Sequence, residues 1–260
     1  MSHFMCGRFV LEDTAEEIAR AFGLDEVEAF PPRYNIAPTQ PILIVRARDV
    51  PDGSNLPRRE AVFARWGLLP SWVKDPKDFP LLINARSETA ASKASFRSAM
   101  RRGRILVPAS GFYEWKRTDA RDGRGKPIIE PFWVRPRCGG SIAFAGLMET
   151  NEMGGGPIDT ACIMTVDAND TFRPIHHRMP VVIDPSDFER WLNFEVNDPR
   201  AVADLLRTPD EDFFEAVPIS DRVNKVANQG PELLEPVERV AEPVAPDKAS
   251  EPEPEQPSLF

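Results

Sequence analysis

The chain has 260 residues, of which 42% are hydrophobic and 28% are charged. This arithmetic fits one fairly large globular domain, or a domain with an appendage, and excludes a fibrous or wholly disordered chain. No run of about 18 apolar residues occurs, so we expect no membrane span. The formal net charge of −9 argues against a nucleic-acid partner for the chain as a whole, because phosphate binding needs clustered Lys and Arg side chains.

Hydrophobic periodicity and cap residues predict many short elements. The first helix is expected from Thr14 to Phe22, with Thr14 or Asp13 as its cap and Gly23 as its stop. Strands are expected at residues 41–45, 60–68, 104–108, 111–115, 132–134, 142–147, 161–166 and 181–183, and further helices at residues 87–100, 186–191 and 199–206. Because no alternating strand–helix–strand rhythm appears, we predict one α+β domain with an antiparallel sheet.

The last thirty residues differ from the rest in composition. They hold seven Pro, seven Glu and one Asp against one Arg and one Lys, and therefore carry −6 of the net −9. Such a segment cannot bury enough apolar surface to offset its ordering entropy, so we expect residues 238–260 to be a disordered tail. The remaining domain is close to neutral, which weakens the charge argument against nucleic acid.

The three cysteines, Cys6, Cys138 and Cys162, are far apart and form no CxxC pair. This favours neither a zinc site nor a disulfide framework, so we expect reduced thiols, no metal and no cofactor. Residues 1–5 lack the charged and then apolar pattern of a secretory signal, and we expect a cytoplasmic protein.

Two segments combine a polar side chain with a setting suited to chemistry. Cys6 precedes a glycine and so has little steric shielding, which suits a nucleophilic thiol; the alternative is a small buried hydrophobe. Asn84 and Arg86 end an apolar strand at a predicted helix start, where anions bind; the alternative is an ordinary cap with a surface arginine.

Two further segments contain groups suited to proton transfer. Glu114 lies amid aromatic residues, with Phe112 on its own face of the predicted strand, which suits a general acid or base; the alternative is a glutamate at a sheet edge. His176 and His177 are adjacent. Because no HExxH motif or distant His/Cys set accompanies them, proton transfer is favoured over metal binding.

In this order, the segments resemble the SRAP family, the SOS-response-associated peptidases or abasic site processing proteins. The resemblance covers nearly all of residues 5–237 and rests on Met5–Phe9, Tyr34–Pro38, Arg65–Leu68, Ile83–Arg86, Phe112–Trp115, Ile175–Pro180, Val223–Lys225 and Asn228–Gly230. It implies an SRAP-like α+β domain over residues 6–237, with antiparallel sheets forming an open barrel-like core flanked by helices.

The resemblance also implies a sensor of abasic sites in single-stranded DNA, which links itself covalently to the lesion and shields it during replication and the SOS-type DNA damage response. The catalytic residues carried over by motif are Cys6, Asn84, Glu114 and His176. An N-terminal cysteine condenses through its amine and thiol with the aldehyde of an opened abasic sugar, giving a thiazolidine. Glu114 would move protons, Asn84 would hold the amine, and His176 would bind the sugar oxygen or phosphate.

The segment 1–5 departs from the family pattern, because this chemistry requires a free Cys6 amine. Either translation begins at Met5, or the protein removes its own leader, as the peptidase name of the family implies. We expect the Met5 start, since Met before a small Cys is a good aminopeptidase substrate.

The stretch from Arg86 to Arg104 contains six basic residues and a single acidic one. On the predicted helix, basic residues recur at i, i+4 and i+8 on one face, while Phe96 and Met100 can pack inward. The expected DNA-binding residues are Arg8, Arg86, Trp72, Lys93, Arg97 and Arg101, and Trp66 is either a second base-stacking residue or part of the core. The alternative is a solvated helix face.

The segment Gln256–Phe260, Gln-Pro-Ser-Leu-Phe, resembles the QxxLF peptide by which bacterial repair proteins bind the polymerase sliding clamp. Gln256, Leu259 and Phe260 are its fixed positions, and the two apolar side chains stand alone in an acidic, proline-rich segment. The expected partners are therefore abasic single-stranded DNA and the clamp, with a monomeric, nucleoid-associated protein; the alternative for the peptide is a chance match.

Two other functions remain open. A cysteine hydrolase or peptidase using Cys6, His176 and Glu114 would turn over a peptide or ester without a DNA adduct. A non-catalytic module would bind single strands without needing the Cys6 thiol.

Overall fold

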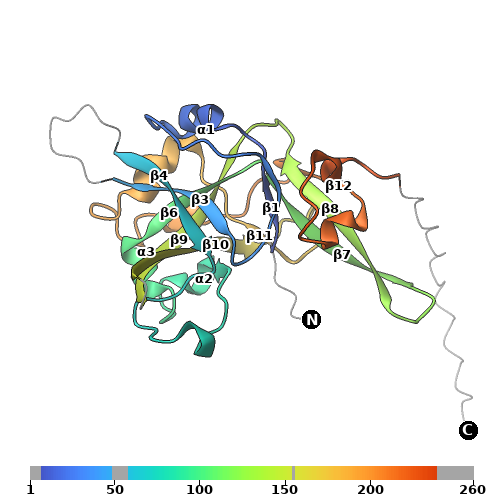
Figure 1. Ribbon diagram of the computed structural model, residues 1–260, viewed down its shortest axis with the longest axis horizontal. Helices are drawn as coiled ribbons and strands as arrows, with labels where there is room; N and C mark the ends of the chain where they lie inside the picture. Colours follow the sequence, from blue (N-terminus) through green and yellow to red (C-terminus); the bar gives the residue numbers. More distant parts are fainter. Residues whose placement is uncertain (1–6, 49–57, 154–155, 239–260) are drawn as a thin grey trace, which may run out of the picture.

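Five strands form a small barrel, seen in the left half of Figure 1. The computed structural model describes residues 7–48, 58–153 and 156–238. The barrel strands, in spatial order, are β10 (Gly156–Asp167), β4 (Arg59–Trp66), β3 (Pro41–Ala47), β6 (Arg104–Ala109) and β9 (Ile142–Met153), and β9 pairs again with β10. Two of the strand pairings in the barrel are short: β3 pairs with β6 at one residue pair, and β10 pairs with β4 at two. The antiparallel, barrel-like α+β core is confirmed.

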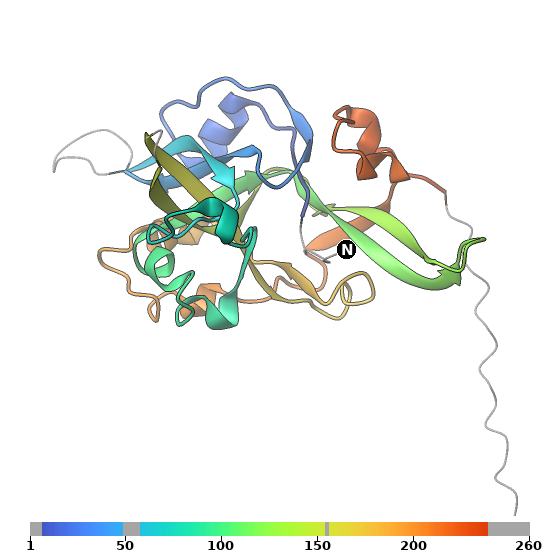
Figure 2. The same cartoon turned by 60° about the horizontal axis from the view of Figure 1, so that its bottom comes forward.

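A second sheet crosses one side of the barrel. Its spatial order is β12 (Phe214–Pro218), β8 (Pro127–Pro136), β7 (Gly111–Arg121), β1 (Phe9–Leu11) and β2 (Arg33–Ile36). The β7–β8 hairpin runs beyond the body of the molecule, as Figures 1 and 2 show. The short strand β1 therefore lies between the β2 edge and this long hairpin.

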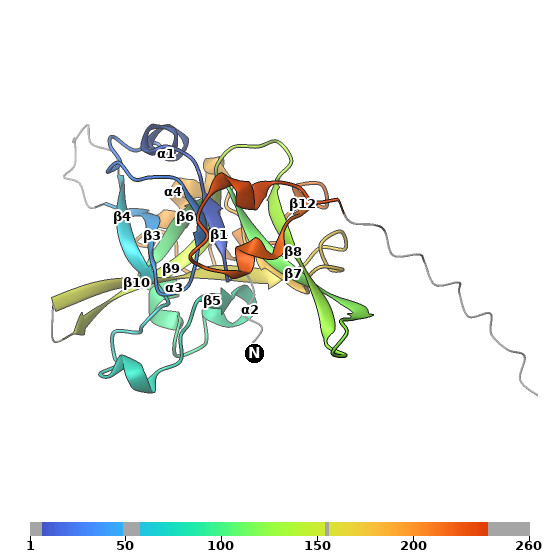
Figure 3. The same cartoon turned by 45° about the vertical axis from the view of Figure 1, so that its right-hand side comes forward.

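Two short strands complete the barrel end near the start of β1. Strand β5 (Asn84–Arg86) runs parallel to β10, and β11 (Arg178–Pro180) pairs with the end of β10. Figure 3 shows β5 and the helix α2 (Ser87–Ala90) below β1. The two parallel pairings of β10, with β4 and with β5, are the departures from the predicted antiparallel pattern.

Aromatic packing fixes β1 against the barrel. Phe9 meets Trp66 edge to face with ring centroids 5.2 Å apart, and it also contacts Phe144. Trp66 is fully buried and donates from its indole nitrogen to the carbonyl oxygen of Ile83 at 3.0 Å. Trp66 is thus a core residue, and the expectation that it stacks on a base is wrong.

The first predicted helix is confirmed, whereas the second is wrong. Helix α1 (Ala15–Phe22) begins with a capping box formed by Thr14 and Glu17, and it ends at Gly23 in the left-handed conformation. The helix expected at residues 87–100 is instead α2 and α3 (Arg97–Arg102), separated by turns. The Ser92 hydroxyl bonds the Thr89 carbonyl oxygen in this break, and such local bonds compete with helix propagation.

The other expected helices are also shorter than predicted. Residues 186–191 correspond to a 3₁₀ turn, η2 (Pro185–Asp187), which Asp184 caps, and to α4 (Phe188–Leu192). Residues 199–206 contain only η3 (Ala203–Leu205), and the remaining 3₁₀ turns are η1 (Pro76–Asp78), η4 (Asp221–Asn224) and η5 (Pro231–Leu234). The strand expected at 181–183 is a single bridge, because regular pairing with β10 ends at β11. Within the described residues, no helix is long and apolar enough to cross a membrane.

Replacing Trp66 by Phe tests the coupling between β1 and the barrel. We expect Trp66→Phe to lower the free energy of unfolding by about 2–4 kcal/mol, because it leaves a cavity and removes one of the two hydrogen bonds that the Ile83 carbonyl oxygen accepts. The matched change Trp72→Phe, at a side chain that is 57% exposed, should stay within about 0.5 kcal/mol of wild type. Chemical denaturation measures both, and equal losses would contradict this account.

Candidate functional site

The start of β1 lies against the buried carboxylate of Glu114. Phe9 pairs with Phe112 in antiparallel register, and the Tyr113 backbone nitrogen donates to the Arg8 carbonyl oxygen at 3.0 Å. Continued by two residues, this register places Gly7 opposite Glu114, whose side chain is only 3% exposed. Cys6, which precedes Gly7 in the sequence, lies outside the described residues, and its role stays a prediction.

Asn84 reaches the same region from the barrel. It is the first residue of β5 and pairs with Ile163 of β10. The preceding carbonyl group, that of Ile83, accepts the indole hydrogen bond of Trp66, on which Phe9 packs. The half-buried Asn84 is therefore positioned by the same aromatic contacts that hold β1.

His176 approaches from the loop between β10 and β11. Its backbone nitrogen donates to the Phe172 carbonyl oxygen at 3.2 Å, and the Phe172 ring meets Phe112 edge to face at 5.7 Å. Phe112 lies on the same face of β7 as Glu114, because side chains two residues apart share a face. Through Phe172, the loop that carries His176 is thus held against the face of β7 on which Glu114 also lies.

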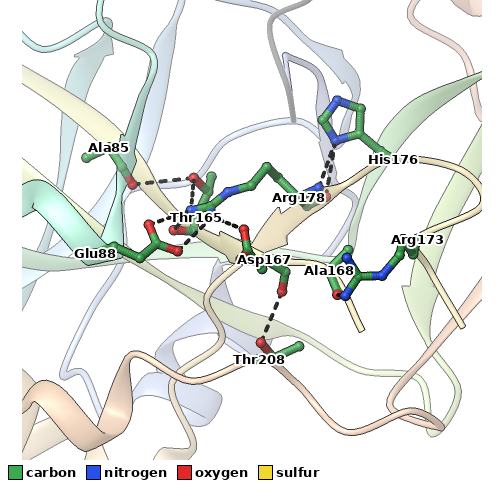
Figure 4. A network of polar contacts seen from close by, with 9 residues as sticks. All are labelled: Ala85, Glu88, Thr165, Asp167, Ala168, Arg173, His176, Arg178 and Thr208. Carbon is green, nitrogen blue, oxygen red and sulfur yellow. Dashed lines mark hydrogen bonds and ion pairs between the residues drawn. The ribbon is translucent and has the colours of Figure 1, made fainter. Parts of the chain in front are cut away.

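Contacts with the Arg178 backbone orient the His176 ring. The backbone nitrogen of Arg178 donates to Nδ1 of His176 at 3.1 Å, and Nδ1 also lies 3.3 Å from the Arg178 carbonyl oxygen (Figure 4). Which of the two contacts is the stronger hydrogen bond depends on which ring nitrogen carries the proton. The ring also stacks on His177 with centroids 4.4 Å apart. His176 is therefore held by its Nδ1 edge and by stacking.

Arg178 joins the loop that carries His176 to the strand that carries Asn84. Its guanidinium donates to both carboxylate oxygens of Glu88 at 2.6 and 2.9 Å, to Asp167 and to the Thr165 carbonyl oxygen (Figure 4). Arg178 is 6% exposed. Glu88 belongs to α2, which directly follows β5, the strand that begins with Asn84. The Arg178 side chain therefore ties the loop of His176 to the segment of Asn84.

The charges of this network stabilise each other. Burial alone would raise the pKa of Glu88, but its hydrogen bonds with Arg178 outweigh burial and lower it. Burial alone would lower the pKa of Arg178, but Glu88 and Asp167 raise it above the ordinary value. Neither Glu88 nor Asp167 was expected at the site from the sequence. The position of Glu88, four residues after Asn84, could have indicated it, because the turn of α2 brings that residue back toward β10.

Arg8 is occupied by contacts within the protein. Its guanidinium donates to Asn35 at 2.8 Å and to the carbonyl oxygens of Val223 and Asn224 at 2.9 and 3.4 Å. Burial lowers the pKa of Arg8. Asn35 is fully buried and also bonds the Val223 carbonyl oxygen, so both residues fasten η4 to β1 and β2. A DNA contact by Arg8 stays a prediction, beside this structural role.

The basic stretch is divided between the surface and the core. Arg86, Lys93, Arg97, Arg101 and Arg102 are exposed, as is Trp72. Because the helix is broken, Lys93 lies in a turn outside α3, and the single basic helix face is wrong. Arg104 donates to the carbonyl oxygens of Trp191 at 2.6 Å and Asn197 at 2.7 Å, and burial lowers its pKa to about 10. The inward packing of Phe96 and Met100 is confirmed.

Metal chemistry receives no support from the residues that can be placed. Across 7–48, 58–153 and 156–238, no group of three His, Cys, Asp or Glu side chains is arranged to hold a metal ion. Cys138 is exposed, and burial raises the pKa of the Cys162 thiol. The inward-facing groups of the site are therefore a carboxylate, an amide and an imidazole, which suit proton transfer and hydrogen bonding.

Comparisons with known proteins find similar sequences and a shared fold. The chain matches the family model described as SOS response associated peptidase (SRAP) over residues 5–226. It is 38% identical over 235 residues to the abasic site processing protein YoqW of Bacillus subtilis (strain 168), covering 89% of this chain and 99% of that protein. It is 32% identical over 241 residues to the abasic site processing protein YedK of Escherichia coli (strain K12), covering 90% and 100%. A solved structure from Bacteroides thetaiotaomicron shares the fold with a TM-score of 0.74 at 23% identity, over 89% of this chain and 100% of that one.

The Glu88–Arg178 pair gives stability a defined pH dependence. We expect Glu88→Gln to lower the free energy of unfolding by about 1 kcal/mol at about pH 7, because solvent screens this half-exposed carboxylate. The pKa of Glu88 is lowered on folding, so its contribution is complete above the unfolded value of about 4.3 and is lost as the pH falls through the folded value.

Urea denaturation of both proteins across this pH range checks the prediction. The two unfolding free energies should converge as the pH falls below about 4. Glu195→Gln, at an exposed carboxylate, serves as the matched control and should show no convergence. A gap between wild type and Glu88→Gln that stays constant into strong acid would contradict the pairing.

Proposed function

Since the chain belongs to the SOS response associated peptidase (SRAP) family, we propose that it processes abasic sites in DNA. Two relatives that match nearly all of their length bear the name abasic site processing protein. The observation that supports the proposal is that Asn84, Glu114 and the loop of His176 are each linked, through backbone pairing or aromatic packing, to β1 or to its neighbour β7. We further infer that the substrate is single-stranded and that the product is a covalent adduct with Cys6.

The chemistry of Cys6 explains why an abasic site is a suitable substrate. An opened abasic sugar exposes an aldehyde, to which the Cys6 amine adds, and loss of water gives an imine. The thiolate then adds to the same carbon while the nitrogen takes up a proton, which closes a thiazolidine ring. The amine must be unprotonated, and an α-amino pKa of about 7.7–8.0 allows this near neutral pH.

Three side chains have matching roles in this reaction. Glu114 is a buried carboxylate opposite Gly7, so it can move protons as the sugar opens and as water leaves the amine adduct. Asn84 can hold the amine in position. His176 can bind the sugar oxygen or a phosphate and can pass a proton, because an imidazole both donates and accepts hydrogen bonds.

A surface next to this site suits a single DNA strand. Arg86 lies two residues after Asn84 and is exposed, and Lys93, Arg97 and Arg101 are exposed further along the chain. Such side chains bind phosphate groups without reading sequence. Trp72 is exposed and meets Phe79 edge to face, which leaves an aromatic face available for a base. This activity would belong to the DNA damage response.

A peptidase is the second candidate function, because the family description names one. Residues 1–5 precede Cys6 in this chain, and a free Cys6 amine requires that the Met5–Cys6 bond be absent or cleaved. Cys6, His176 and Glu114 would then act as a hydrolase on that bond, separately from any lyase-like chemistry at the abasic sugar.

The covalent adduct is directly testable. We expect wild-type protein mixed with single-stranded abasic DNA to give a shifted band that survives denaturation, and Cys6→Ala to abolish it. Cys138→Ala removes an exposed thiol elsewhere and should retain the band. Glu114→Gln should slow adduct formation by about 10²-fold or more, because proton transfer loses its carboxylate. Denaturing gel electrophoresis over time measures all four proteins.

Other outcomes separate the alternatives. Peptide or ester turnover without an adduct would favour the hydrolase, and full DNA binding by Cys6→Ala with no adduct in wild type would favour a binding module. Intact mass spectrometry completes the test. If protein that retains Met1–Met5 still crosslinks, the thiazolidine assignment is wrong.

We also propose that the segment Gln256–Phe260 binds the polymerase sliding clamp. This segment lies outside the described residues, and its support is the QxxLF pattern together with two apolar anchors in an acidic stretch. Deletion of Leu259 and Phe260 should abolish pull-down by a purified bacterial clamp, because a short peptide docks mainly through such anchors. Ser258→Ala changes a variable position and should bind normally. Undiminished binding by the deletion would dispose of this proposal.

A further inference from the structure

A polar cavity of about 440 Å³ lies between the end of β3, helix α3 and strand β9. None of Asn84, Glu114 and His176 lines it. Gly103, at the end of α3, forms part of its wall, and a Cβ atom there would lie 2.2 Å from the Met148 carbonyl oxygen. The glycine thus permits the close approach of α3 to β9 that shapes the cavity.

Most charged groups around this cavity are already paired. Arg46 binds Glu60 at 2.8 Å and also Asp159, so the Glu60 carboxylate is neutralised. Glu149 accepts a hydrogen bond from the Ser71 backbone nitrogen at 2.7 Å. The nearby Arg104 is held by internal carbonyl groups. These groups therefore shape the cavity, and their charges and donors are already used by contacts within the protein.

Two arginines that line the cavity have guanidinium groups available for a ligand. Within the described parts of the chain, the guanidinium groups of Arg48 and Arg102 make no hydrogen bond or ion pair. Arg48 directly follows β3 and Arg102 lies on α3, so they approach from different elements, and Ser98 adds a hydroxyl group one helical turn before Arg102. Two guanidinium groups and a hydroxyl match the charge and acceptor geometry of a phosphate group.

We propose that this cavity binds a backbone phosphate of the DNA strand, away from the abasic nucleotide. The proposal rests on the proposed function, because it gives the same strand a second contact. Arg97 and Arg101 are exposed on the adjoining side of α3, and the half-buried Phe194 ring in the wall offers an apolar surface to a sugar or base. Ser71 lines the cavity, and the next residue is the exposed Trp72. A strand leaving the site would therefore meet cationic and aromatic groups in succession.

The test measures binding of undamaged single-stranded DNA of about 25 nucleotides by fluorescence anisotropy over a range of salt. The double variant Arg48→Gln, Arg102→Gln should bind about tenfold more weakly, and its slope of log affinity against log salt should shrink by about 0.7 for the lost phosphate contact. The charge-matched variant Arg137→Gln, Arg200→Gln removes two exposed arginines outside the cavity and should lose clearly less. An equal loss in both variants, or no loss in the first, would overturn the proposal.

Further arms identify the source of the phosphate and guard against misfolding. Titration calorimetry with thymidine monophosphate and with inorganic phosphate tests free ligands; binding that Arg48→Gln, Arg102→Gln removes while strand affinity is unchanged would overturn the strand assignment. Arg102→Gln alone, at an exposed side chain, should show part of the affinity loss with an unchanged thermal midpoint. Failure of wild type to crosslink abasic DNA would reject the proposed function only, because these affinities use undamaged DNA.

Discussion

The candidate site depends on the pairing of β1, a strand of three residues, with its neighbours. An isolated strand of this length has little stability of its own, so its position is set by what it contacts. Backbone bonds to β7 fix its register, Phe9 anchors it to Trp66 in the barrel, and Arg8 fastens η4 over it. A shift of one residue would exchange the faces of the strand and turn Phe9 away from Trp66. The register that packs Phe9 on Trp66 is therefore also the register that sets Gly7 opposite Glu114.

The second half of the site depends on a buried charge. Removing an arginine from water is costly unless its donors are satisfied, and Arg178 finds Glu88, Asp167 and a backbone carbonyl group as acceptors. The planar guanidinium can bind both oxygens of Glu88 while it also reaches β10, which a lysine ammonium cannot do. The loop before β11 is thereby held at a fixed distance from β5. The elements that carry Asn84, Glu114 and His176 are thus joined by the Arg178 ion pairs on one side and by aromatic packing on the other.

The parts of the fold that the sequence predicted are those with local causes. Helix α1 begins and ends where its capping box and glycine require, and the long barrel strands follow their apolar runs. Strands β1, β2 and β11 were missed, because three or four residues carry no periodicity and their pairing is set by partners distant in the sequence. The helix expected at residues 87–100 was wrong for a related reason. Its spacing allowed a helix, but the structure breaks it at Ser92 and buries Phe96 against the core. The strands that carry Asn84 and Glu114 were expected, yet only the contacts of Trp66, Phe112 and Arg178 explain how these strands and the loop of His176 are held together.

The same long-range contacts explain why net charge describes this surface poorly. Arg8, Arg104 and Arg178 count as cations in the sequence. Each of them, however, donates its hydrogen bonds to carbonyl groups or carboxylates inside the protein. Segments without regular structure leave carbonyl groups in need of donors, and an arginine fork supplies several donors at once. The charge that remains for a polyanion is therefore the set of arginines and lysines that no internal acceptor has claimed. Several members of that set lie on α3, on the turn before it and just after β3, so the acidity of the whole chain does not determine the local charge of this face.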